Sequence, residues 1–326
     1  MNQPLLSVRD LEVTFELQRG GWFTPPRRLR AVRGVSFDLQ PGRTLALVGE
    51  SGSGKTTTAM SAIRLAPCSG GTVHFDGTDL MALPPAAMRA QRRHMQVIFQ
   101  DPYSSLNPRE RVGALVREPL DLMDVGDPAA RDDRVREMFE VVGLRPDQMA
   151  LFPHQFSGGQ RQRISIARAL ATNPRLIVCD EPVSALDVAI QAQILNLLRR
   201  LQAELGLSYL FISHDLGVVQ FICDDIAVMY LGEIVEQTDR DTLFTTPRHP
   251  YSAMLLEAAP SLARRKSRGY RRAAQVKGDL PSPMNLPPGC AFATRCPRAQ
   301  ARCHAENPGL RDLGASRVAC HYPLEG

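Results

Sequence analysis

The sequence lacks any long hydrophobic run, and this absence argues against a membrane-spanning helix. No stretch reaches the ~18 consecutive apolar residues that a helix needs to cross a bilayer. The first residues, MNQPLLSVRDLEV, lack the basic stretch and apolar run of a signal peptide. We therefore expect a cytosolic protein, in which thiols stay reduced and clustered cysteines serve metals or redox chemistry more often than disulfides.

Aromatic residues are scarce as well, at 6% of the chain, and the formal net charge is only +5 over 326 residues. Two short Arg-rich stretches, residues 27–30 and 264–272, are interpreted as solvated loops, with contact to anionic lipid headgroups or a partner as the alternative. No aromatic stacking pattern accompanies these charges, which argues against nucleic-acid binding.

Apolar strands alternate with helical segments along most of the chain. This order predicts an α/β fold with a mostly parallel sheet and helices on its faces. Residues 101–165 are richer in helix and loop and predict an inserted helical subdomain. After residue 260 the composition becomes basic and then Pro-rich, as in a linker or an extended segment. We expect a main domain of residues 1–260 and a small Cys-rich extension of residues 261–326.

A phosphate-binding loop is predicted between an apolar strand and a helix. Residues 49–56, GESGSGKT, match G-x-x-x-x-G-K-[ST] in the context that this motif needs. The glycines let backbone N–H groups converge on phosphate oxygens, and the helix N-terminus adds partial positive charge. We expect Lys55 to reach the β- and γ-phosphates of ATP and Thr56 to ligate Mg²⁺. The expected nucleotide contacts in this loop are Gly49, Ser51, Gly52, Ser53, Gly54, Lys55, Thr56 and Thr57.

Two acids follow the apolar residues 176–179, where a buried strand would deliver them to the ligand edge of a sheet. Asp180 is suited to hold Mg²⁺, directly or through water. Glu181 is suited to polarise the attacking water as a general base. An acidic pair after a strand is weak evidence alone, but together with a phosphate loop it indicates an NTPase.

Residues 156–163, FSGGQRQR, form a second predicted anion cradle, in which Ser157, Gly158, Gly159 and Gln160 lead into a helix. A second cradle makes sense if it completes the site of a neighbouring subunit. This run resembles the signature sequence of the ABC ATPases.

Further elements resemble that family, in the family's order, over residues 5–260. Gln100 resembles the Q-loop glutamine, which would touch Mg²⁺ or the water while its loop contacts a membrane partner. Asp187 resembles the D-loop aspartate at the dimer interface, and His214 the switch histidine at the γ-phosphate. Phe15 stands where the family has an aromatic that stacks on adenine, although it could equally be a core residue.

The resemblance implies that two ATPase subunits associate head to tail. Each ATP lies between one phosphate loop and the signature loop of the other subunit, and the γ-phosphate favours the closed dimer. Hydrolysis opens the dimer and moves attached membrane helices. The alternative of a soluble ABC ATPase of DNA repair or translation predicts a coiled-coil insertion or two fused halves, and the sequence has neither.

A resemblance to the oligopeptide and dipeptide importer branch of that family is carried by residues 100–108, 182–193, 248–251 and 280–290. The pattern is most similar to the F-type ATPase subunit, which pairs with a D-type paralogue beneath two permease subunits fed by an extracytoplasmic solute-binding protein. The expected location is the cytoplasmic face of the cell membrane. Short peptides are the implied cargo, with nickel, glutathione or another small solute as alternatives.

Four of the seven cysteines, Cys290, Cys296, Cys303 and Cys320, follow a C-x5-C-x6-C-x16-C spacing. Four thiolates suffice for zinc or for an iron–sulfur cluster, and no C-x2-C zinc knuckle is present. The extension resembles that of family members with a [4Fe–4S] cluster, which we expect here. Zinc or reduced cysteines are the alternatives, and His304 and His321 could substitute as ligands. Cys68, Cys179 and Cys223 are interpreted as ordinary small residues.

Overall fold

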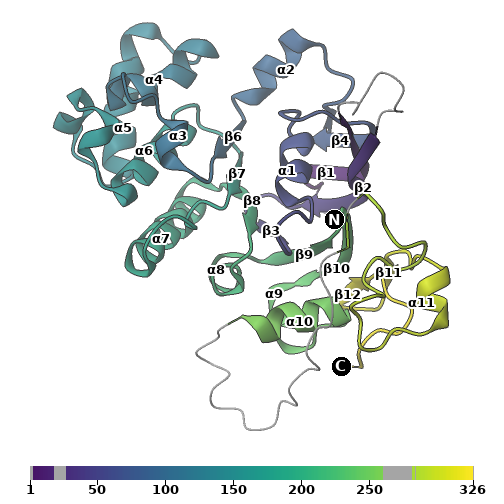
Figure 1. Cartoon of the computed structure of the whole chain (residues 1–326). Coiled ribbons are helices and arrows are strands. Elements are labelled where there is room, and N and C mark those ends of the chain that lie inside the picture. The colour runs from purple at the N-terminus through teal and green to yellow at the C-terminus, as the bar shows by residue number, and fades with distance from the viewer. Residues whose placement is uncertain (1–2, 18–26, 260–280, 283, 326) are drawn as a thin grey trace. The chain divides into compact units, whose positions relative to one another are not determined.

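The structure is a computed structural model that describes residues 3–17, 27–259, 281–282 and 284–325, in two compact units (Figure 1). Unit 1 comprises Met1–Gln3, Leu39–Thr44 and Ala82–Ile212. Unit 2 comprises Pro4–Asp38, Leu45–Met81 and Ser213–Gly326. The Arg-rich stretch 264–272 and most of the predicted linker lie outside the described residues.

Unit 1 contains a parallel sheet of three strands. Strand β7 (Leu176–Asp180) lies between β6 (Met95–Ile98) and β8 (Ser208–Ser213), whose last residue belongs to unit 2. Every residue of β7 and β8 is buried, as the apolar runs predict. A strand buried on both faces is typical of parallel sheets covered by helices.

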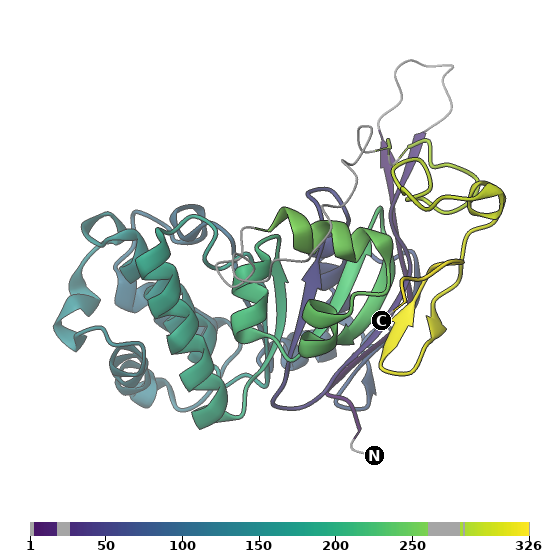
Figure 2. The same cartoon turned by 90° about the horizontal axis from the view of Figure 1, so that it is seen from below.

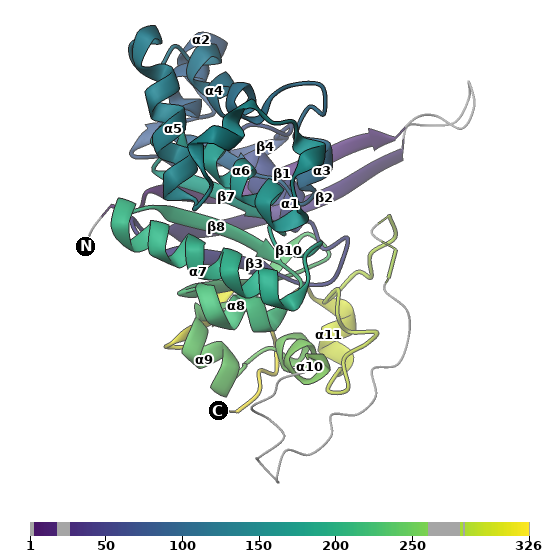
Figure 3. The same cartoon turned by 90° about the vertical axis from the view of Figure 1, so that its left-hand side faces the viewer.

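Unit 1 is rich in helices, several of which lie in the stretch 101–165 where the sequence predicts a helical subdomain. Helix α6 packs against α4, α5 and α7, and Figure 3 shows α4, α5 and α6 grouped together. The helix α7 begins at the N-cap Asp187 and ends at Gly206, whose φ of 66° suits a glycine C-cap. The helices are α2 (Pro85–Arg92), α3 (Pro102–Ser105), α4 (Val112–Leu122), α5 (Arg131–Val141), α6 (Gly158–Leu170) and α7 (Val188–Leu205), with short 3₁₀ turns at Pro128–Ala130, Pro146–Ala150 and Pro153–Gln155.

Unit 2 contains two groups of strands. The first is a sheet in the order β2-β1-β4-β5, in which β4 pairs antiparallel with β1 and with β5, and the second has the order β11-β12-β10-β9-β3. The strands are β1 (Leu6–Leu17), β2 (Arg27–Leu39), β3 (Thr44–Val48), β4 (Gly70–Phe75), β5 (Thr78–Asp79), β9 (Asp225–Tyr230), β10 (Glu233–Asp239), β11 (Arg311–Asp312) and β12 (Ser316–Val318).

The helices of unit 2 are short. They are α1 (Lys55–Ala62), α8 (Leu216–Ile222), α9 (Arg240–Thr245), α10 (Pro250–Ala258) and α11 (Ala301–Ala305). The yellow C-terminal segment in Figure 2 includes α11, β11 and β12. Through β12 this segment pairs with β10, so the extension adds strands to the sheet.

The antiparallel strands add detail to the expected, mostly parallel sheet, and one Arg-rich stretch differs from its interpretation as a loop. The sheet is mixed: β3 pairs with β9 in parallel, but β9, β10, β12 and β11 pair antiparallel, because a hairpin and the returning C-terminal segment supply them. The Arg-rich stretch 27–30 lies in β2 and not in a loop. There Arg28 and Arg30 form ion pairs with Glu16 and Glu12, so part of this charge is neutralised within the unit.

Candidate functional site

The phosphate loop of unit 2 joins the buried strand β3 to α1, as the motif predicts. Gly49 and Gly54 have φ angles of 154° and 100°. A Cβ atom at Gly49 would lie 2.2 Å from the Met229 carbonyl oxygen, and one at Gly54 would lie 2.6 Å from that of Ala31. Both positions therefore require glycine, because backbone atoms occupy the space that a side chain would fill.

Lys55, at the first position of α1, is almost fully buried and curls back over the loop. Its Nζ donates hydrogen bonds to the carbonyl oxygens of Gly49 and Glu50, both at 2.9 Å. The ammonium group is thus held by the loop whose amides are predicted to bind phosphate. The buried Ser53 hydroxyl has no hydrogen-bond partner among the described residues, and Thr56 is exposed at the start of α1.

The two predicted acids stand at the end of β7 in unit 1. Asp180 is buried, and Glu181 has a φ of 46°, a left-handed conformation that non-glycine residues rarely adopt. The Glu181 amide donates to the carbonyl oxygen of Ile212, and its Oε2 accepts a hydrogen bond of 2.9 Å from Nε2 of Gln100. Backbone strain of this kind clusters at functional sites, where surrounding contacts impose it.

The signature loop of unit 1 is a helix N-terminus with a reciprocal capping box. The Ser157 hydroxyl accepts from the Gln160 amide at 3.3 Å, and Gln160 Oε1 accepts from the Ser157 amide at 2.9 Å. A Cβ atom at Gly159 would lie 2.5 Å from Cγ2 of Ile190 on α7, whereas one at Gly158 would make an ordinary contact. Asp187, expected at a dimer interface, is exposed and caps α7 through the Ile190 amide.

The remaining predicted residues belong to unit 2. His214 is exposed, directly after β8, and the neighbouring Asp215 caps α8. Phe15 is half-buried on β1, and Ser51, Gly52 and Thr57 belong to the phosphate loop and α1. The structure thus brings Gln100 to Glu181 within unit 1, and Lys55 to its own loop within unit 2.

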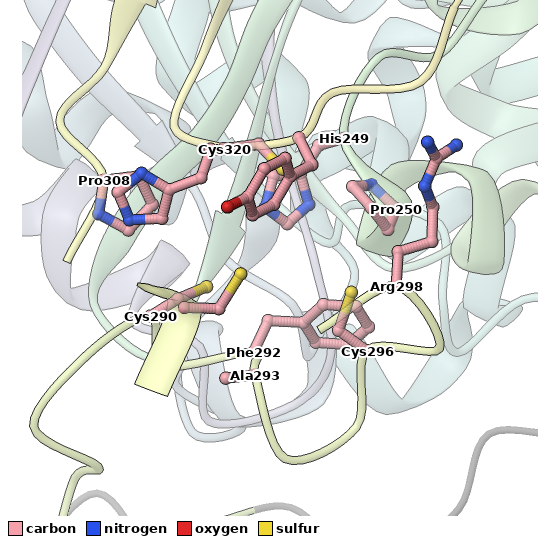
Figure 4. A pocket seen from close by; sticks show the side chains of 12 residues that line it. His249, Pro250, Cys290, Phe292, Ala293, Cys296, Arg298, Pro308 and Cys320 are labelled. Carbon is pink, nitrogen blue, oxygen red and sulfur yellow. The ribbon is translucent and has the colours of Figure 1, made fainter. Parts of the chain in front are cut away.

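Four cysteines of the extension line one pocket of unit 2: Cys290, Cys296, Cys303 and Cys320 (Figure 4). The Cys290 amide donates to the Cys303 carbonyl oxygen at 2.8 Å, which closes the loop between them. Burial raises the pKa of Cys290 to about 11 and also raises the pKa values of Cys296 and Cys320. These thiols are therefore protonated at neutral pH.

Two histidines also line this pocket. His321 was a predicted alternative ligand, whereas His249 was not predicted and stands at the N-cap of α10. His304, the other predicted alternative, does not line the pocket. Among the residues that the structure describes, no group of three or more Cys, His, Asp or Glu is arranged to hold a metal ion. The predicted [4Fe–4S] site thus has no support beyond the shared pocket and the thiols themselves.

Cys68, Cys179 and Cys223, expected to be ordinary small residues, are not in disulfides, and neither are the other four cysteines. Cys179 is fully buried on β7, as expected, and burial raises its pKa well above the usual range. Of the described residues, no helix has the length and apolar character that a membrane crossing requires.

Comparison with known proteins shows the family to which this chain belongs. The ABC transporter family model matches residues 32–184, and the model for the C-terminal region of oligopeptide/dipeptide transporters matches residues 235–303. The dipeptide transport ATP-binding protein DppF of Escherichia coli (strain K12) is 46% identical over 320 residues, covering 98% of this chain and 95% of that protein. This chain belongs to the family of peptide-transporter ABC ATP-binding proteins.

Other relatives agree with this assignment. The oligopeptide transport ATP-binding protein AppF of Bacillus subtilis (strain 168) is 44% identical, over 98% of this chain and 97% of that protein. Among solved structures, the dimeric ATP-binding cassette MJ0796 bound to ADP and Pi is similar, with a TM-score of 0.63 and 27% identity. The match covers 72% of this chain and 98% of that chain. The α/β fold expected from the sequence is therefore confirmed as that of an ABC ATPase.

Proposed function

We propose that this chain hydrolyses ATP to power a membrane importer of dipeptides or oligopeptides. The phosphate loop carries the proposal, because backbone oxygens exclude any side chain at Gly49 and Gly54 and Lys55 is held over the loop. Such a loop binds phosphate through its backbone amides and its lysine. The proposed nucleotide contacts are those named above: Phe15, Gly49, Ser51, Gly52, Ser53, Gly54, Lys55, Thr56 and Thr57.

In the proposed reaction, Glu181 accepts a proton from the water that attacks the γ-phosphate, and the bond to the leaving ADP oxygen breaks. Gln100 orients Glu181 through its hydrogen bond, and His214 contacts the γ-phosphate. Thr56, Gln100 and Asp180 would hold Mg²⁺, since hydroxyl, amide and carboxylate oxygens are the ligands that this ion prefers. A bound Mg²⁺ would neutralise charge on the phosphates.

The signature loop is proposed to act on the nucleotide of a second ATPase subunit, most simply a D-type paralogue. Ser157 is exposed at the N-terminus of α6, a position that favours an anion. The capping box keeps the loop ordered while its first amides remain available. Gly158, Gly159, Gln160 and Asp187 complete this proposed contact surface.

The surface beside Gln100 supports a membrane partner. Phe99 directly precedes Gln100 and Tyr103 follows it by three residues, and their side chains are 43% and 62% exposed. We propose that two permease subunits dock here, at the cytoplasmic face of the cell membrane, and receive cargo from an extracytoplasmic binding protein. The peptide cargo is inferred from the relatives, which are named as dipeptide and oligopeptide transport proteins. Nickel, glutathione or another small solute is the alternative cargo.

For the extension of residues 261–326, we propose that the four pocket cysteines hold a [4Fe–4S] cluster. Thiolate is the ligand chemistry of such clusters, and a multi-atom cluster spans a wider ligand set than a single zinc ion. When bound, the cluster would cross-link a tail that contains few apolar residues. Metal loading would have to displace the protons of buried thiols.

One preparation tests these proposals together. The chain is purified from its native membrane without oxygen, its partners are identified, and its iron, zinc and absorbance spectrum are measured. Uptake of a labelled dipeptide, nickel or glutathione is then followed in vesicles with and without ATP. We expect two permeases, a second ATPase, iron, and ATP-dependent dipeptide uptake. Absence of any membrane protein contradicts the transport proposal, and a colourless, iron-free protein contradicts the cluster.

A further inference from the structure

Glu50, the second residue of the phosphate loop, forms an ion pair with Arg295, which lies in the extension 245 residues later. The guanidinium binds both carboxylate oxygens, with Nη1–Oε2 of 2.8 Å and Nη2–Oε1 of 2.9 Å. The Arg295 side chain is 10% exposed and that of Glu50 is 29% exposed, so solvent screens the pair only in part. Bidentate geometry of this kind fixes orientation as well as distance.

Aromatic residues support the pair from unit 2. The Tyr251 hydroxyl accepts a hydrogen bond of 2.9 Å from the Glu50 amide, so both the main chain and the side chain of Glu50 are held. Phe292, three residues before Arg295, packs against Tyr230 and Tyr251 with ring centroids 5.3 and 5.4 Å away. The aromatic contacts of Phe292 therefore hold the extension in place next to the ion pair between Arg295 and Glu50.

The ion pair with Arg295 and the hydrogen bond from Lys55 meet at the same residue of the phosphate loop, because Lys55 donates to the Glu50 carbonyl oxygen. A loop that is already in its binding conformation binds phosphate more tightly, because less ordering free energy is lost on binding. We propose that Arg295 is a positioning residue of the ATP site, which holds the phosphate loop through Glu50 in the conformation that binds the nucleotide phosphates. This inference rests on the proposed function, because it needs ATP to bind at that loop.

The same turn connects the loop with the cysteine pocket. Arg295 directly precedes Cys296, whose amide donates to the Phe292 carbonyl oxygen at 2.9 Å. Both Phe292 and Cys296 line the pocket. The extension thereby becomes part of the nucleotide site, in addition to being an appendage on the sheet.

The test measures ATP affinity and steady-state ATP hydrolysis of the intact chain in its transporter complex. Arg295→Ala is expected to raise the ATP dissociation constant and KM about tenfold, within the range of measured couplings between sites, with kcat changed much less. Arg295→Lys is expected to fall between, because an ammonium cannot bind both carboxylate oxygens in a fixed plane. Glu50→Gln should weaken affinity like Arg295→Ala, and the double variant should be no weaker than either single variant.

The matched control is Arg302→Ala, which removes an exposed arginine of the same extension whose ion pair, among the described residues, is with Glu306, four residues away. It should leave KM unchanged. An unchanged KM for Arg295→Ala, or full additivity with Glu50→Gln, would overturn the positioning role, since two independent losses mean that the pair does not act as one unit. A melting-temperature profile for each variant separates loss of positioning from loss of the fold.

Lys55→Ala separates this inference from the proposed function. If Lys55→Ala binds ATP normally, the phosphate loop is not the ATP site and both fail. If Lys55→Ala loses ATP binding while Arg295→Ala keeps the wild-type KM and dissociation constant, only the role of Arg295 fails.

Discussion

Nε2 of Gln100 donates a hydrogen bond of 2.9 Å to Oε2 of Glu181. The two residues are separated by 81 positions and lie after the adjacent parallel strands β6 and β7, whose carboxyl ends meet at one edge. The bond links the loop proposed to contact the membrane partner with the proposed general base. Movement of that loop would therefore change the orientation of Glu181. In this way a membrane partner that contacts the loop would influence the proposed hydrolysis of ATP.

Glu181→Gln is expected to lower ATP turnover at least ~100-fold, because the amide cannot accept the proton of the attacking water. ATP binding should persist, since the phosphate loop is unchanged. Phosphate release and nucleotide binding measure the two effects. Glu204→Gln, the same change at an exposed position near the end of α7, is the control and should keep wild-type turnover. Unaltered turnover in Glu181→Gln would remove Glu181 as the base.

Gly159→Ala is expected to destabilise unit 1 by about 1–3 kcal/mol, the usual cost of overpacking, because its Cβ would lie 2.5 Å from Cγ2 of Ile190. Chemical denaturation of the full chain measures the change. Gly158→Ala is the neighbouring control: its Cβ would lie 3.5 Å from Cδ2 of Leu186, an ordinary contact. Equal stability of the two variants would mean that α6 and α7 do not pack as described.

Gly54→Ala is expected to be more harmful than Gly52→Ala. Both glycines have positive φ, at 100° and 78°, so both alanines carry a strain of about 1–2 kcal/mol. Only at Gly54 would the new Cβ also meet a backbone atom, the Ala31 oxygen at 2.6 Å, whereas Gly52 faces open space. Thermal denaturation and ATP binding compare the variants. A Gly52→Ala protein that is equally damaged would show that strain, and not the close approach, dominates.

The buried His249 is expected to lower the free energy of unfolding of the protein in acid. Burial lowers its pKa to about 3, whereas an unfolded histidine titrates near ~6.5. Below pH ~6.5 the imidazole is protonated in the unfolded chain but stays neutral in the folded chain. The free energy of unfolding therefore falls by up to about 1.4 kcal/mol for each unit by which the pH is lowered. This loss continues as the pH falls towards the folded-state pKa.

The test compares melting temperature against pH for wild type and His249→Asn. Asparagine keeps an acceptor where Nδ1 of His249 accepts from the Tyr251 amide, but it binds no proton. The variant should have a shallower pH dependence below pH ~6.5. Glu236, whose buried carboxylate accepts from the Arg248 and His249 amides, has a pKa raised by burial and titrates in both proteins. Parallel curves for the two proteins would contradict the assignment.

Contiguous motifs were predictable because their geometry is local. A buried strand, Gly49, Gly54 and Lys55 in fixed order give one loop conformation, since backbone oxygens leave room only for glycine at two of its positions. The buried strands β7 and β8 followed from their unbroken apolar runs for a similar reason. The capping box of Ser157 and Gln160 spans three residues, and its sequence order alone indicates a helix start.

The contacts between distant segments were not predictable in this way. The clustering of the four cysteines was expected, but nothing in the sequence indicates that His249 lines the same pocket, because α10 and the extension meet only after folding. The antiparallel strands that make the sheet mixed also depend on the return of the C-terminal segment to β10.

The sequence by itself determined the phosphate loop, the acidic pair and the signature loop, because backbone sterics and short hydrogen bonds act between near neighbours. Only the tertiary structure decided that Gln100 meets Glu181 and that Arg295 meets Glu50, across 81 and 245 residues. The packing of the strands and of the extension decides such pairs, because it brings together residues that lie far apart along the chain.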